Sequence, residues 1–248
     1  MNRKHVLLAA GAIALAAPAF ASDQPGVAGN AWKEEGSGGV NYTGAIPTDA
    51  GQYPIGYVTT DKANATRGEG PLNTITGTLT FTQDVDMFCI AITDPAGFSA
   101  LVSGNGFAGS PNIALFDTQG HGIAFNDNNP ANNSSTQSRL TNLFTASQPA
   151  GLYFIAVSRN DGSVLNYPFN AAATTMFPTS PANVEYGPIN PTDVLTSWQN
   201  PGGGGGFQLS NFNYTITLTG AGFHQLPAPG AAGLLAMGGL VAMRRRRN

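Results

Sequence analysis

The residues of this 248-residue sequence best suited to chemistry are four carboxylates, Asp84, Asp86, Asp117 and Asp127. One residue separates Asp84 from Asp86, so an extended chain directs both side chains to the same face. Asp117 and Asp127 end two later strand-like runs that a sandwich of sheets can bring to the same rim. Oxygen ligands of this kind suit Ca²⁺, which takes six to eight of them. We therefore predict a calcium site here; the alternative is that these residues only form turns.

Residues for nucleophilic or acid–base catalysis are sparse. The sequence contains no GxSxG, HExxH or P-loop motif. His121 lies in a Gly-flanked turn and is expected to be an exposed loop residue, whereas His224 lies near the C-terminal segment. The single cysteine, Cys89, stands in a dense apolar run, which indicates a buried thiol and excludes an internal disulfide. We predict a protein without catalytic residues; a hydrolase with an unfamiliar site is the alternative.

The charge distribution argues against nucleic acid as a partner. The formal net charge is −3, from 11 basic and 14 acidic residues. Six of the basic residues lie in terminal segments, at Arg3, Lys4 and positions 244 to 247. Without those six, 5 basic residues face 14 acidic ones, a net charge of −9 that repels nucleic acids and anionic membranes.

The first 21 residues have the pattern of a secretory signal peptide. Two basic residues precede the apolar run Val6 to Ala17, and Ala19 and Ala21 supply the small residues of a signal peptidase site. A short buried helix is the alternative, but it would not explain the order of these features. The pattern predicts that the protein is exported.

The central stretch Thr74 to Thr93 predicts two strands that form a hairpin. Apolar and threonine residues alternate from Ile75 to Thr82, as in a strand with one wet face. The run Met87 to Ile92 is apolar in both phases, as in an interior strand. Short runs bounded by Gly, Asn, Asp or Pro then recur at spacings of about ten residues: Phe98 to Ser103, Asn112 to Phe116, Gly122 to Asn126, Ser138 to Phe144 and Gly151 to Ser158. A last strand, Phe207 to Leu218, is expected to close the sandwich.

These runs predict an all-β fold, an antiparallel β-sandwich of the jelly-roll-like kind, with an N-terminal signal helix and a C-terminal hydrophobic helix. The sandwich is expected over residues 72–220, after a Gly-rich lead-in at 22–71, and with a Pro- and Gly-rich surface insertion at 159–206. Several aromatic residues lie outside the core runs, and they either stack on sugar rings or anchor long loops: Trp32, Tyr167, Phe169, Phe177, Tyr186 and Trp198.

The C-terminal segment, residues 226–248, combines a proline-containing motif, an apolar run and an arginine cluster. Pro227, Pro229 and Gly230 precede the thirteen apolar or small residues from Ala231 to Met243. As a helix, this run measures about 20 Å at about 1.5 Å per residue, against about 30 Å of hydrocarbon core. Four arginines that favour the cytoplasmic side follow the run: Arg244, Arg245, Arg246 and Arg247. We predict a transient membrane stop that is removed by processing; a permanent short anchor is the alternative.

This tail resembles the PEP-CTERM sorting signal that exosortase systems recognise. Its motif reads PAPG, with Ala228 where glutamate is typical. The resemblance implies an exosortase-type protease as a partner, a bacterium with an outer membrane, and a life style that produces exopolysaccharide.

The body resembles the pre-peptidase C-terminal type of β-sandwich, and more closely its DVUA-type relatives in PEP-CTERM proteins. The resemblance rests on the succession of DVDMFCIAI, TDPAGFSA, IALFDTQGHGIAFNDN and PAGLYFIAVS. It implies a non-catalytic extracellular module, and some domains of that type bind calcium at loop carboxylates.

The sequence thus predicts a non-catalytic protein of the cell surface or extracellular matrix, associated with exopolysaccharide or biofilm and attached to the membrane only transiently. A carbohydrate-binding module for exopolysaccharide is the alternative. Calcium is the one cofactor that the residues suggest.

Overall fold

The computed structural model describes residues 30–33, 66, 68, 70–79, 85–105, 110–129, 131, 137–160, 167–199 and 212–224. These residues contain twelve β-strands and no helix. The all-β class predicted from the sequence is confirmed for this part of the chain. Both predicted terminal helices, at 1–21 and 226–248, lie outside the described residues.

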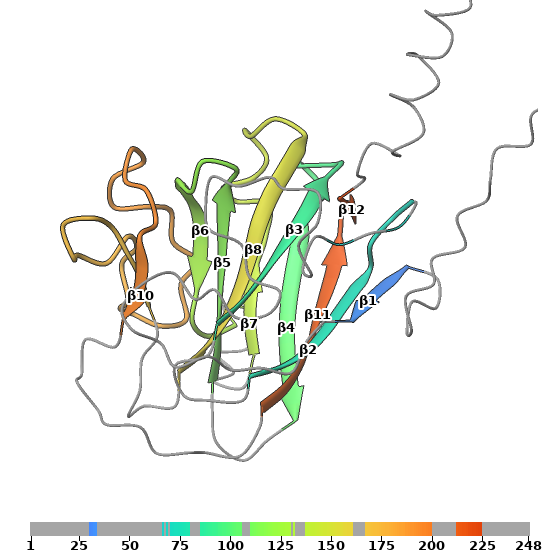
Figure 1. Cartoon of the computed structure of the whole chain (residues 1–248), viewed down its shortest axis with the longest axis horizontal. Coiled ribbons are helices and arrows are strands. Elements are labelled where there is room, and N and C mark those ends of the chain that lie inside the picture. Colours follow the sequence, from blue (N-terminus) through green and yellow to red (C-terminus); the bar gives the residue numbers. More distant parts are fainter. Residues whose placement is uncertain are drawn as a thin grey trace, which may run out of the picture.

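Ten strands form two five-stranded sheets (Figure 1). The first sheet has the order β1-β2-β11-β4-β7, made of Ala31–Lys33, Thr74–Leu79, Phe212–Thr219, Ser99–Asn105 and Gln137–Leu140. The second has the order β12-β3-β8-β5-β6, made of Ala221–Phe223, Val85–Ile92, Gly151–Asn160, Ser110–Asp117 and Gly122–Asn126. All neighbouring strands in the two sheets are antiparallel except the parallel pair β1 and β2.

The two sheets enclose one common apolar core. Phe88 and Ile155 enter it from the second sheet, and Val102 and Ile216 from the first, and all four are fully buried. Alternate residues of each strand point to this core because side chains in a strand alternate between faces. In β11 the inward residues are buried and the outward ones exposed or half-buried, as the sequence alternation predicted.

The predicted hairpin between the first two strands is not formed. Thr74–Leu79 pairs with β11, and Val85–Ile92 pairs with β8, in the opposite sheet. The physical reason is the different polarity of the two strands. β2 has a polar face that must stay wet, whereas β3 is apolar on both faces and is stable only in a sheet covered on both sides.

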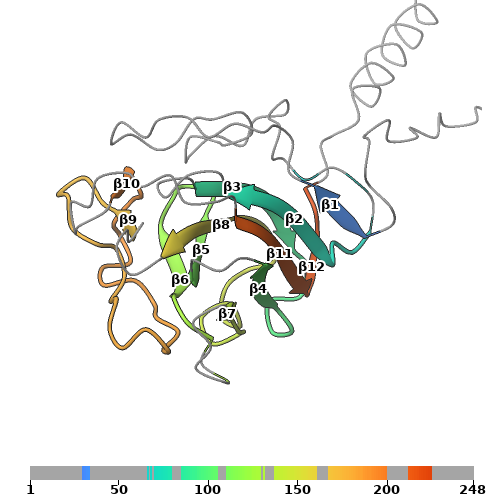
Figure 2. The same ribbon diagram turned by 90° about the horizontal axis from the view of Figure 1, so that it is seen from below.

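The second sheet is covered on its outer face by the 167–199 segment, which contains β9 (Tyr167–Phe169) and β10 (Ser197–Gln199). This segment lies beside β5 and β6 in both views (Figure 1, Figure 2). A second apolar cluster joins Met87, Phe116 and Phe154 of the sheet to Phe177 and Trp198 of the segment. The expected surface insertion is therefore a covering layer with its own core, because it must bury the second apolar face of β3, β5 and β8.

The folded body also extends beyond both expected boundaries. Trp32 of β1, expected in an unstructured lead-in, is 1% exposed and packs in the common core. At the other end, β12 adds to the edge of β3, and Leu72 N–H donates to Ala221 O at 2.9 Å. A possible edge strand at Tyr53 to Thr59, and the expected core residue Phe81, lie outside the described residues. Within the described ranges no helix is long and apolar enough to cross a membrane.

Candidate functional site

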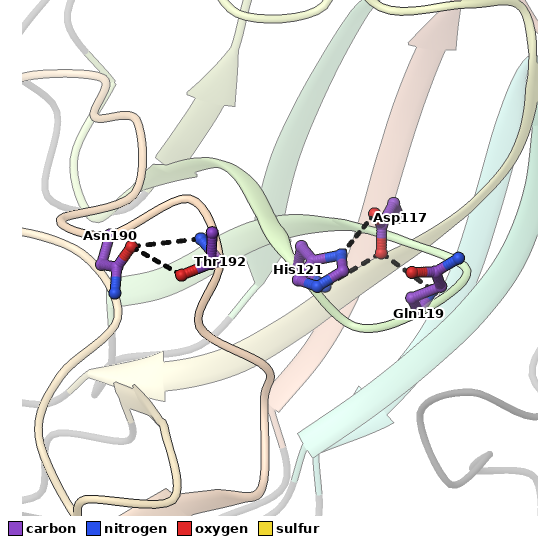
Figure 3. A network of polar contacts seen from close by, with 5 residues as sticks. All are labelled: Asp117, Gln119, His121, Asn190 and Thr192. Atoms are coloured by element: carbon purple, nitrogen blue, oxygen red, sulfur yellow. Dashed lines mark hydrogen bonds and ion pairs between the residues drawn. The ribbon is translucent and has the colours of Figure 1, made fainter.

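Asp117 and His121 form the best-defined pair of chemically capable side chains, in the turn that joins β5 to β6 (Figure 3). The turn closes through Gly120 N–H, which donates to Asp117 O at 3.1 Å, and Gly120 has a φ of 90° that favours glycine. Asp117 Oδ1 accepts the N–H groups of Gln119 and His121 at 2.8 and 2.9 Å. An aspartate that binds the backbone two residues on is a usual turn former.

The remaining carboxylate oxygen orients the imidazole. Asp117 Oδ2 lies 2.8 Å from Nδ1 of His121. Because an ionised carboxylate only accepts hydrogen bonds, Nδ1 of His121 is the donor in this contact. The His121 side chain is 28% exposed, so the predicted loop histidine is in fact half-buried and fixed in one orientation.

The 167–199 segment passes beside this turn. His121 forms a β-bridge with Val194, and Leu195 N–H donates to Gly120 O at 3.0 Å. Asn190 and Thr192 belong to the same stretch, where Asn190 Oδ1 accepts from the N–H and hydroxyl of Thr192 at 3.2 and 2.9 Å (Figure 3). The pair therefore lies where the covering segment contacts the end of the second sheet.

The arrangement has two of the three members of a hydrolase triad. Among the described residues, no serine, threonine or cysteine side chain bonds to His121. Cys89 lies inside the covered sheet, and burial raises its thiol pKa to about 12, so the reactive thiolate is suppressed. His224 is 3% exposed, and its backbone N–H donates to Thr66 Oγ1 at 3.1 Å. This hydrogen bond fixes the chain just after β12.

Asp86, expected at the rim, lies instead between the two sheets. It is 1% exposed, and the Tyr214 hydroxyl of the opposite sheet donates to its Oδ2 at 2.7 Å. The residue belongs to β3, where it pairs with Val157, and its neighbours on the same face are core residues. The Tyr214 hydroxyl supplies a hydrogen-bond donor, which a buried carboxyl group needs.

Asp127 follows β6 and is 5% exposed. Burial raises the pKa of Tyr167 in the covering segment, and the charge of the Asp127 carboxylate raises it further, to a smaller extent. Nearby, the Ser138 hydroxyl donates to Asp127 O and to Pro111 O. Asn126 joins three elements, because its side chain donates to Val184 O at 3.1 Å and accepts from Arg139 N–H at 2.8 Å.

The three described carboxylates of the predicted calcium site are separated in the sheet. Asp117 pairs with Tyr153, which pairs with Ile90, so Asp117 is four residues further along than Asp86, about 13 Å at about 3.4 Å per residue. Asp127 lies beyond β6, three strands away from β3. The described ranges contain no group of three or more His, Cys, Asp or Glu residues able to hold a metal ion. Asp84 lies outside those ranges, and a calcium ion stays a prediction.

Glu185, which the sequence did not single out, ties the covering segment to the first sheet. Its Oε2 accepts the N–H and hydroxyl of Thr141 at 2.9 and 2.6 Å, while Oε1 is buried without a hydrogen-bond partner. Burial raises the pKa of Glu185, and the bonds from Thr141 and the charge of Arg139 lower it to a smaller extent. The only sequence signal is a lone acidic residue within an apolar, proline-rich stretch.

The aromatic residues singled out from the sequence anchor loops. Tyr186 is half-buried against the second core, and the other five are buried: Trp32, Tyr167, Phe169, Phe177 and Trp198. Phe116 meets Phe177 and Trp198 edge to face, with ring centroids 6.0 and 6.1 Å apart. The sequence left two roles open for these rings, stacking on sugars and anchoring loops, and their burial favours the anchoring of loops.

Comparison with known proteins gives no family for this chain. No family model matches it, and no curated protein matches it. The resemblances of the tail and body stay predictions from the sequence. Function is therefore argued from the fold and from the contacts of the described residues.

Proposed function

We propose that this chain is a non-catalytic, exported protein of the bacterial cell surface or extracellular matrix, whose body is a jelly-roll β-sandwich. The strand order carries the fold part of this proposal, and the patterns of the two terminal segments carry its location. Without the short edge strands β1 and β12, the sheets read β2-β11-β4-β7 and β3-β8-β5-β6. Eight strands divided in this order between two facing sheets have jelly-roll connectivity.

The roles of the polar side chains support a module without catalysis. Both oxygens of Asp117 are used within its turn, and Asp86 and Glu185 bind Tyr214 and Thr141. Each of these contacts joins elements that are distant in the sequence or closes a turn. Side chains committed to the fold in this way are poorly placed to exchange protons or ligands with a substrate.

The residue patterns at 1–21 and 226–248 support the proposed location outside the cell. The pattern of residues 1–21 favours export, and the tail favours retention at the membrane until a protease of the exosortase type acts. Pro227 comes four residues after the end of β12 at Phe223. Cleavage near Pro229 would therefore leave every described strand in the released protein.

Cell fractionation tests the proposal. The wild-type chain is expected outside the cell or on its outer surface, and a variant with all four arginines changed to serine is expected to accumulate unprocessed or escape. A variant with the same four positions changed to lysine is the matched control, because it retains the positive charge. Wild-type protein confined to the cytoplasm would contradict the proposal.

Carbohydrate binding is the second candidate. The aromatic residues expected to stack on sugars are buried, or half-buried in the case of Tyr186, so this candidate depends on hydrogen bonding. Its support is the outer face of the first sheet, where the outward positions of β2, β4 and β11 carry threonine, serine and asparagine, with Leu101 as the apolar exception. Hydroxyl and amide groups of this kind can both donate to and accept from sugar hydroxyls.

A further inference from the structure

The outer face of the first sheet carries hydroxyl groups in rows that cross the strands. In one row Thr76, Thr215 and Ser103 are in register across β2, β11 and β4. In the next row Thr74 is paired with Thr217. Along each strand these residues alternate with residues of the common core, so they point away from it.

The hydroxyls at the ends of this face and those at its centre differ in their hydrogen bonds to other described residues. Near its ends, Thr78 donates to Asn213 at 2.8 Å, and Ser99 and Thr219 share a hydrogen bond of 2.9 Å. Among the described residues, no hydrogen bond engages the hydroxyls of the central residues, which are Thr74, Thr76, Ser103, Thr215 and Thr217. Five hydroxyls in register can therefore donate to and accept from one extended ligand.

The charged residues at the described outward positions of this sheet are both basic, and the charge of one of them, Arg139, also acts on Glu185 of the covering segment. Lys33 pairs with Thr76 at one edge of the sheet, and Arg139 pairs with Leu101 at the other, four strand spacings or about 19 Å away. None of the described outward positions of these five strands holds aspartate or glutamate. This is notable because 14 acidic residues face only 5 basic ones once the terminal segments are set aside.

We propose that the outer face of the first sheet binds an acidic polysaccharide. Uronate carboxylates pair with Lys33 and Arg139, and the sugar hydroxyls between them bond to the free threonine and serine hydroxyls. Two cations separated by neutral hydroxyls suit a chain of sugars better than a polymer with a phosphate on every unit, which needs a denser row of cations. The proposal rests on the proposed extracellular function for its biological context.

Binding of alginate to the purified full chain tests the proposal, with dextran as the uncharged polysaccharide. Alginate is expected to bind at low salt, to bind less well as sodium chloride is added, and to bind more tightly than dextran. Replacing both cations, Lys33→Gln with Arg139→Gln, should weaken alginate binding about tenfold, or about 1.4 kcal/mol, because two exposed ion pairs are lost together.

Two control variants separate this site from a general effect of charge. Lys33→Arg with Arg139→Lys keeps both cations and should retain binding. Ala150→Asp with Ala171→Asp lowers the net charge by the same two units at exposed positions outside the first sheet, and should bind nearly as well as wild type. An equal loss in this control and in the glutamine variant would overturn the proposal.

The hydroxyl contribution is tested separately. Thr76→Val with Thr215→Val keeps side-chain shape and strand propensity while removing two hydroxyls, and should weaken alginate binding several-fold at an unchanged melting temperature. Equal affinity for dextran and alginate, or no binding of alginate by wild type, would refute the acidic-polysaccharide site. Export and processing are measured by fractionation and mass, so failure here leaves the proposed function standing.

Discussion

A buried hydrogen bond joins the two sheets of this protein within their common apolar core. The Tyr214 hydroxyl of β11 donates to the Asp86 carboxylate of β3, a contact that spans 128 residues of sequence. Both side chains are buried, at 3% and 1% exposed. The loss of a hydrogen bond inside a core is costly, because the group left behind has no water to bond to.

Removing this hydroxyl tests the structural role of Asp86. Tyr214→Phe should lower the free energy of unfolding by about 1–3 kcal/mol, because a buried carboxylate loses a donor. Urea unfolding in excess EDTA and in millimolar calcium measures the loss. It should be the same in both solutions; a loss that appears only in calcium would instead place Asp86 in a metal site.

The thiol of Cys89 should be inert in the folded protein. Burial raises its pKa to about 12, so at pH 8 very little thiolate exists. Iodoacetamide at pH 8 is expected to leave native protein unmodified and to alkylate it completely in guanidinium chloride. Rapid alkylation of native protein would mean that the covering segment does not protect this face of β3.

The covering segment is the element that most distinguishes the observed structure from the expected one. The sequence predicted β3 as an interior strand, correctly, since Met87 to Ile92 is apolar in both phases. Periodicity could not identify what covers the second face, because the partner segment has almost no regular strand. The same limit explains why the burial of Trp32 was not predicted, because its strand of three residues is too short to show a period. It also explains why the pairing of β2 with β11 was not predicted.

The candidate site was predictable only in part. Asp117 as a turn former follows from its place before Gly120, and this alternative was recognised in the sequence. Burial of Asp86 and the role of Glu185 depend on Tyr214 and Thr141, which are remote in sequence. Such contacts are set by tertiary packing, which local patterns do not encode.

The contact between Glu185 and Thr141 makes the attachment of the covering segment depend on pH. The pKa of Glu185 is raised in the folded state, so its stabilising contribution is complete below the unfolded pKa and is lost as pH rises through the folded value. Glu185→Gln keeps an acceptor for Thr141 and removes the charge. Its stability relative to wild type should therefore increase between about pH 4 and pH 7. Chemical unfolding across this range measures the difference, and a difference that is constant or decreases with pH would contradict the linkage.

At the scale of the whole molecule, the described strands lie between two segments whose residue patterns predict export and sorting. The described strands run from Ala31 to Phe223, and the proposed cleavage points, after Ala21 and near Pro229, both fall outside them. The body carries 5 basic and 14 acidic residues, whereas the tail ends in four arginines. The sequence predicts that Ala231 to Met243 forms a helix of about 20 Å with the arginines on the cytoplasmic side, which would make a poor permanent anchor.

The most direct test of the central claim is the intact mass of the native protein recovered from outside the cell. We expect one species that lacks Met1 to Ala21 and everything after about Pro229. Recovery of a species that still carries Arg244 to Arg247 would contradict processing and favour a membrane-anchored form.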